Sequence, residues 1–105
     1  MKIVIVICHD VPEVIWNAFR LANMMLEGME DVSIFLNGPS VNYENFDSKR
    51  FPLIELSKIF TLSEGTLLAW GKLMDLHGVK EGYHKRGTQK NLYDLIQKSD
   101  KIITY

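Results

Sequence analysis

Cys8 is the only cysteine in the chain and its best candidate nucleophile, and His9 and Asp10 follow it directly. A thiolate transfers sulfur only when a nearby cation or a helix N-terminus lowers the pKa of the thiol, and His9 and the next helix would both be close enough to do so. A lone cysteine at the end of an apolar strand is more often a small buried hydrophobe. The sequence therefore leaves two interpretations of Cys8, a reactive thiol and a core residue.

A second candidate group is Trp70, Gly71 and Lys72, at the end of an apolar run. An indole at a strand exit can stack on a flat ligand, but more often it fills a pocket or packs against another subunit. His77 opens a basic stretch that would attract an anionic ligand or simply be solvated. The members of this stretch are His77, Lys80, His84, Lys85, Arg86 and Lys90.

The turn around Cys8 is predicted to connect a strand to a helix. The β-branched run from Ile3 to Ile7 is typical of a strand buried on both faces. Apolar residues then recur at three- and four-residue steps from Val11 to Leu26, which predicts an amphipathic helix. Asp10 would cap this helix, and Glu13 would complete a capping box.

The side chains of Asn17 and Arg20 lie one turn apart on this predicted helix, where both could share a face with Glu13. Asn17 is a candidate binding or interface residue. An ion pair between Arg20 and Glu13 is the simplest explanation of the two charges.

The rest of the chain alternates strands and helices, separated by polar loops at Val41–Arg50 and Gly78–Gly87. This alternation predicts a single α/β domain over residues 1–105, a three-layer sandwich with a mainly parallel sheet of four to five strands. A flavodoxin-like strand order of 2-1-3-4 would place Cys8 opposite Trp70 across a crevice. The later elements are expected at Asp31–Leu36, Phe51–Leu62, Thr66–Trp70, Lys72–His77, a helix capped by Thr88, and Lys101–Tyr105.

Composition limits the classes of function. A net charge of −1 gives no general attraction to nucleic acid or to anionic membranes, and the longest apolar run, Ile3–Cys8, is too short to span a bilayer. We therefore expect a cytoplasmic protein that contacts neither. The histidine and cysteine spacing fits no compact metal site, and no glycine-rich nucleotide motif is present, so no metal or cofactor is expected.

Four stretches, in the same order, resemble the DsrE/DsrF-like family, which includes YchN-type proteins and TusBCD-type sulfur-relay subunits. They are MKIVIVICHDVPEVIWNAFRLAN, FLNG, LLAWG and LYDLIQKSDKIITY. The resemblance implies a small α/β subunit that forms trimers or hexamers and meets a sulfur-relay protein partner.

In several family members a cysteine after the third strand accepts a persulfide sulfur, within a segment similar to A-C-G-x-C. The corresponding residues here are Ala69, Trp70, Gly71, Lys72 and Leu73, none of which carries a thiol. The resemblance therefore implies a sulfur-relay-related binding or scaffold subunit rather than an enzyme. Two alternatives stay open: a sulfur carrier that uses Cys8, and a protein that binds a small anion or another small molecule.

Overall fold

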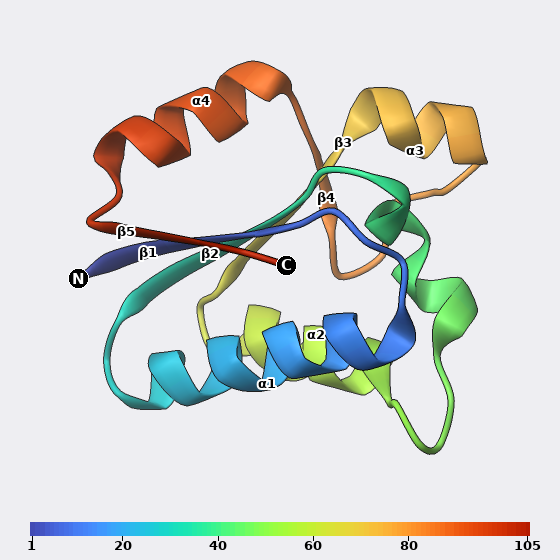
Figure 1. The fold of residues 1–105 in the computed structure, drawn as a ribbon, viewed down its shortest axis with the longest axis horizontal. Coiled ribbons are helices and arrows are strands. Elements are labelled where there is room, and N and C mark those ends of the chain that lie inside the picture. The colour runs from blue at the N-terminus through green and yellow to red at the C-terminus, as the bar shows by residue number, and fades with distance from the viewer.

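The structure, a computed structural model, describes every residue from Met1 to Tyr105. Its elements are β1 (Lys2–Ile7), α1 (Pro12–Glu27), β2 (Asp31–Leu36), the 3-10 helix η1 (Pro39–Phe46), α2 (Leu53–Leu62), β3 (Thr66–Trp70), α3 (Gly71–His77), β4 (Lys85–Gly87), α4 (Gln89–Lys98) and β5 (Lys101–Thr104). The strands form one parallel sheet, with α1 and α2 on one face and α4 on the other (Figure 1). The predicted α/β sandwich is confirmed.

Strand β1 is buried on both faces, as its β-branched run predicts. Ile3, Ile5 and Ile7 belong to the larger hydrophobic cluster, which α1 and α2 cover. Val4 and Val6 point to the opposite face, where they pack in a smaller cluster with Leu92 of α4. The main core therefore lies between the sheet and the α1–α2 layer, and α4 covers a thinner second core. Helix α1 contributes Ile15, Ala18, Phe19 and Ala22 to the main core, all fully buried.

The strand order is β4-β3-β2-β1-β5, so the predicted order of 2-1-3-4 is wrong. Strand β2 lies between β1 and β3, which puts these two strands roughly 10 Å apart, twice the usual strand spacing. The chain moves outward from β1 to β4 and returns to β5 on the other side of β1. Because crossovers between parallel strands are right-handed, this reversal places α4 on the face opposite α1 and α2.

The start of α1 also differs from the prediction. The helix begins at Pro12, its N-cap residue is Val11, and no side chain caps it. Asp10 is one residue too early, so the capping box with Glu13 does not form. Pro12 does occupy the first helical turn, where its missing N–H needs no partner. Thr88, by contrast, caps α4 as predicted.

Both polar loops contain structure that their composition does not predict. Pro39–Phe46 forms the 3-10 helix η1, in which Val41 and Tyr43 are fully buried. The hydroxyl of Ser40 donates a 2.6 Å hydrogen bond to the carbonyl of Ile7, and this bond ties η1 to the end of β1. The second loop ends in the three-residue strand β4, which completes the sheet. None of the helices is both long and apolar enough to cross a membrane.

Candidate functional site

An open cavity of about 350 Å³ lies at the carboxyl ends of β3 and β4. The carboxyl ends of parallel strands are where α/β proteins commonly bind ligands. Three of the residues predicted to form a site line this cavity together. Its lining consists of Trp70, Gly71, Lys72, Asp75, Arg86, Gly87 and Thr88.

The junction between β3 and α3 holds this group in place. Trp70 is both the last residue of β3 and the N-cap of α3, so no loop separates strand from helix. Gly71 is buried, and a Cβ atom there would lie 2.7 Å from Nη2 of Arg86. The missing side chain at Gly71 is what allows the guanidinium group to lie across the junction.

Arg86 forms an ion pair with Asp75. Its Nη1 and Nη2 donate to the two carboxylate oxygens of Asp75 at 2.7 and 3.0 Å. This two-point hydrogen bond lowers the pKa of Asp75 and raises that of Arg86. Lys72 is exposed and forms no ion pair, so its ammonium group is the free cation of the cavity.

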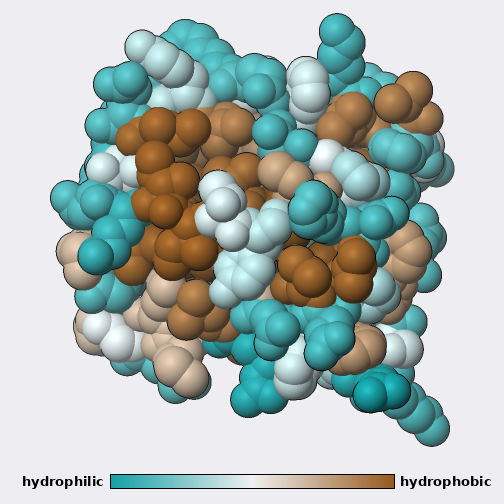
Figure 2. Space-filling view, viewed as in Figure 1, coloured by the Kyte–Doolittle hydropathy of each residue, from teal (hydrophilic) through white to brown (hydrophobic).

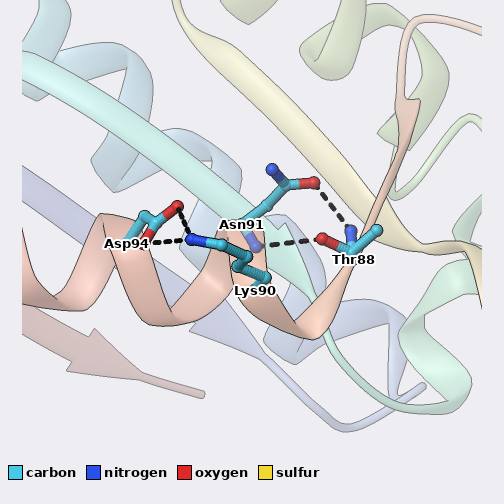
Figure 3. A network of polar contacts seen from close by, with 4 residues as sticks. All are labelled: Thr88, Lys90, Asn91 and Asp94. Atoms are coloured by element: carbon cyan, nitrogen blue, oxygen red, sulfur yellow. Dashed lines mark hydrogen bonds and ion pairs between the residues drawn. The ribbon is translucent and has the colours of Figure 1, made fainter.

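Helix α4 starts at the rim of the cavity with a reciprocal capping arrangement. The hydroxyl of Thr88 accepts from the backbone N–H of Asn91 at 3.0 Å, and the Asn91 side chain accepts from the Thr88 N–H at 2.8 Å (Figure 3). Lys90 forms a 3.3 Å ion pair with Asp94 one turn later. The pair leaves Lys90 less available to a ligand than Lys72.

Trp70 both fills and lines the site. It is half-buried, and it packs against the smaller hydrophobic cluster, which contains Val6 and Phe35. Its remaining surface belongs to the wall of the cavity. An indole in this position can contact a ligand while its other side anchors it to the core.

Cys8 lies apart from the cavity, directly after the end of β1, which is two strands away from β3. It is partly buried and packs against the same small apolar cluster as Trp70. Its backbone N–H donates to the carbonyl of Tyr105 at 2.9 Å, which continues the parallel pairing of β1 with β5. The helix that would activate the thiol begins only at Pro12, four residues after Cys8. His9 and Asp10 are exposed next to it.

The other predicted site residues also lie elsewhere. His77 lines a separate hollow of about 170 Å³ between η1 and the end of α3, together with Glu44 and Lys80. Asn17 is exposed on α1. The expected ion pair of Arg20 with Glu13 does not form, because the Arg20 guanidinium carbon lies 4.8 Å from the centre of the Trp16 ring, a cation–π contact.

One buried polar pair escaped the sequence analysis. His84, predicted to lie in a solvated loop, is fully buried, and its Nδ1 lies 2.9 Å from the hydroxyl of Tyr43. Burial lowers the pKa of His84 and raises the pKa of Tyr43 to about 12. Nε2 of His84 has no hydrogen-bond partner. The only hint in the sequence was the isolated apolar residues of the Val41–Arg50 segment, which includes Tyr43.

Known proteins share the fold of this chain, although their sequences are only distantly similar. No protein-family model and no curated protein matches the chain. Among solved structures, the YchN protein from E. coli superposes with a TM-score of 0.85 at 19% sequence identity, over 100% of both chains. A conserved protein of unknown function from Bacteroides thetaiotaomicron gives a TM-score of 0.79 at 17% identity, over 99% of this chain and 95% of the other. The resemblance to YchN-type proteins is thereby confirmed in the fold.

Proposed function

From the fold that the chain shares with YchN, we propose that this protein is a sulfur-relay-related binding or scaffold subunit without thiol chemistry of its own. The observation that carries the proposal is the cavity at the ends of β3 and β4. Trp70 and Lys72 line it at the position where the family resemblance expects an acceptor cysteine. The site has a pocket and a cation but no sulfur nucleophile.

The chemistry of the lining favours an anionic ligand. Lys72 offers an unpaired ammonium group, and the start of α4 at Thr88 adds the positive end of a helix dipole. Arg86 is part of the cavity wall, but it offers no free charge to a ligand because Asp75 neutralises it. A thiolate or persulfide anion presented by a relay partner, or a small free sulfur anion, matches this combination. The subunit would hold the group without forming a bond to it.

The same proposal includes assembly into a homo-oligomer, the trimer or hexamer that the family resemblance implies. Exposed apolar side chains are present on several elements, among them Leu62 of α2, Leu76 of α3 and Ile102 of β5. Such residues are common at subunit contacts when they form a patch.

A second candidate function, sulfur transfer through Cys8, is favoured by one observation. Cys8 lies where the strand order reverses, between the exits of β1 and β5, and it is only partly buried. The Cys8 thiolate would attack the outer sulfur of a partner's persulfide and form a new S–S bond, while the partner's thiolate leaves with the electrons of the broken bond. The apolar neighbours of Cys8 argue against it, because they do not stabilise a thiolate.

Two measurements separate these functions. The first is an NMR titration of the ¹⁵N-labelled protein with sodium thiosulfate, following the indole N–H of Trp70. We expect saturable shifts that Lys72→Met weakens at least tenfold and that Lys58→Met, at an exposed lysine on α2, leaves unchanged. Unchanged Trp70 signals at all concentrations would contradict anion binding in the cavity.

The second measurement is intact-mass analysis after exposure to polysulfide and, separately, to a thiol-alkylating reagent. The proposed scaffold predicts that Cys8 gains no sulfur and alkylates quickly only after denaturation. Rapid sulfur uptake by the native protein, absent from Cys8→Ser, would favour the carrier function instead.

A further inference from the structure

A narrow recess of about 100 Å³ lies between the sheet and α4, at the amino ends of β1 and β2. The cavity lined by Trp70 lies at the opposite, carboxyl end of the sheet. Val4 of β1 and Leu95 of α4 give the recess apolar walls. Its volume is that of a few water molecules, each ~30 Å³ in the liquid, so it has room for a short side chain.

Ser33 is the buried polar side chain of this recess. It is 8% exposed, and its pairing with Val4 of β1 places it on the α4 face of the sheet. Its hydroxyl forms no hydrogen bond within the chain, whereas the hydroxyl of Ser99, also in the wall, donates to the Ile96 carbonyl at 3.0 Å. Buried polar groups are nearly always hydrogen-bonded. The Ser33 hydroxyl is therefore available to a ligand in the recess.

The surroundings of Ser33 make a polar group there unusual. Figure 2 shows hydrophobic residues gathered on the face that carries β5 and α4. Phe35, the next side chain of β2 toward α4, belongs to the small apolar cluster with Val6 and Leu92. A serine two residues earlier interrupts this apolar layer. Such interruptions are typical of functional positions.

The mouth of the recess carries unpaired charges of both signs. The recess opens into a wider hollow of about 590 Å³, and Lys2, Asp31 and Lys98 line both spaces. All three side chains are exposed, and none forms an ion pair within the chain. A ligand at the mouth therefore meets two free ammonium groups and one free carboxylate.

Two further charged groups border the wider hollow, and each already has a partner. The carboxylate of Asp100 accepts from the backbone N–H of Lys2 at 2.7 Å. The amino group of Met1 forms a 2.6 Å ion pair with Glu30. These groups are less available to a ligand than the three unpaired side chains at the mouth.

This arrangement restricts the chemistry of a ligand. A charged group inside the recess would lose its water and find a single hydroxyl in return, which is costly, so the charges of a ligand must stay at the mouth. Asp31 would repel a simple anion, and the two lysines would repel a simple cation. A zwitterion satisfies both signs, with its carboxylate at the ammonium groups and its own ammonium group at Asp31.

We propose that the recess binds a free α-amino acid with a short side chain bearing a hydroxyl, such as L-serine. Lys2 and Lys98 hold the carboxylate and Asp31 holds the ammonium group. The side chain enters the recess and its hydroxyl bonds to Ser33. This site is separate from the proposed anion site, and its occupation does not depend on the proposed function.

The test is an NMR titration of the ¹⁵N-labelled protein with L-serine at millimolar concentrations. We expect saturable shifts of the backbone amides of Val4 and Ser33, while the indole N–H of Trp70 stays unshifted. Ser33→Ala should weaken binding at least tenfold, because the buried hydrogen bond is lost. The matched control is Ser63→Ala, at an exposed serine after α2, which should leave binding unchanged. Absence of saturable shifts in the wild type overturns the proposal.

Three analogues of L-serine test its functional groups one at a time. L-Alanine lacks the hydroxyl, ethanolamine lacks the carboxylate and 3-hydroxypropionate lacks the ammonium group. We expect each to bind at least tenfold more weakly than L-serine. Equal binding of ethanolamine or 3-hydroxypropionate would overturn the proposal, because the mouth would then not recognise both charges.

Urea denaturation without ligand shows whether the Ser33 hydroxyl serves the fold instead. Since this hydroxyl has no partner within the chain, the urea midpoint of Ser33→Ala should equal or exceed that of the wild type. A lower midpoint would overturn the proposal, because the hydroxyl would then stabilise the protein itself. Thiosulfate binding at Trp70 succeeds or fails independently of these results, since that cavity lies at the other end of the sheet.

Discussion

Tyr43 and His84, 41 residues apart in the sequence, meet in the interior with 2.9 Å between the phenol oxygen and Nδ1 of the imidazole. Their rings pack edge to face with centroids 5.2 Å apart. The contact links η1 to the segment that leads into β4. It therefore holds together the two parts of the chain whose composition is most like that of a solvent-exposed loop.

Acidification should destabilise the fold through His84. Burial lowers the pKa of His84 below its usual value of 6.5, although the nearby charge of Glu44 opposes this shift. Above pH 6.5 the ring is neutral in both the folded and the unfolded chain. Below it the unfolded chain takes up a proton that the folded chain resists, so the free energy of unfolding falls as the pH drops toward the folded-state pKa. Urea denaturation from pH 7.5 to 5 should show this fall for the wild type and a flatter profile for His84→Gln. Parallel profiles would contradict the assignment.

Removing the Tyr43 hydroxyl should cost more than removing an exposed one. Tyr43→Phe leaves Nδ1 of His84 buried without a partner, in addition to Nε2, which already lacks one. Leaving one such buried group unpaired costs about 1–3 kcal/mol. Tyr93→Phe, at a residue that is 60% exposed, is the matched control and should change stability by less than about 0.5 kcal/mol. Both values follow from urea denaturation at pH 7.5, and equal effects would exclude a special role for the pair.

A side chain at Gly71 should release Asp75 from Arg86. The Cβ of Gly71→Ala would lie 2.7 Å from Nη2 of Arg86, and the flexible guanidinium group would move away from it. We expect the pKa of Asp75 to rise toward its usual value, as it should in Arg86→Met, since the hydrogen bond from Arg86 is the main cause of its lowering. NMR titration of the Asp75 carboxyl carbon measures this. Stability should change little, because exposed ion pairs contribute at most about 1 kcal/mol. An unchanged Asp75 pKa in Gly71→Ala would mean that the guanidinium group accommodates the methyl group in place.

The sequence correctly predicted the elements whose apolar residues follow a clear pattern along the chain. The β-branched run of β1 and the three- and four-residue spacing of α1 each favour one structure over any other, and both form as expected. The helix cap at Thr88 was also predicted correctly, because such a cap depends only on residues within one turn of the helix. Local patterns of this kind do not depend on the rest of the fold.

Strand order could not be predicted in the same way. Strands β1 and β2 are both buried over all but their first residue, so either could lie beside β3. The handedness of crossovers does not say in which direction the chain moves across the sheet. For this reason Trp70, Gly71 and Lys72 were correctly grouped by adjacency in sequence, but the expected approach of Cys8 to Trp70 was wrong. Burial of His84 was likewise invisible, because it depends on Tyr43 in a distant segment.

The position of Cys8 should depend on Gly38. A Cβ atom at Gly38 would collide with the carbonyl oxygen of Cys8 and lie 3.1 Å from its carbonyl carbon, and neither backbone atom can move without shifting the end of β1. Backbone strain is not involved, since the φ of Gly38, −173°, is open to any residue. Gly38→Ala should therefore destabilise the protein by about 1–3 kcal/mol, as overpacking does. It should also speed alkylation of Cys8, because the strand end must move away. Gly28→Ala is the matched control: its Cβ would meet only ordinary contacts at 3.4 and 3.7 Å, so neither stability nor alkylation should suffer. If both variants alkylate at the wild-type rate, close packing at Gly38 does not set the exposure of Cys8.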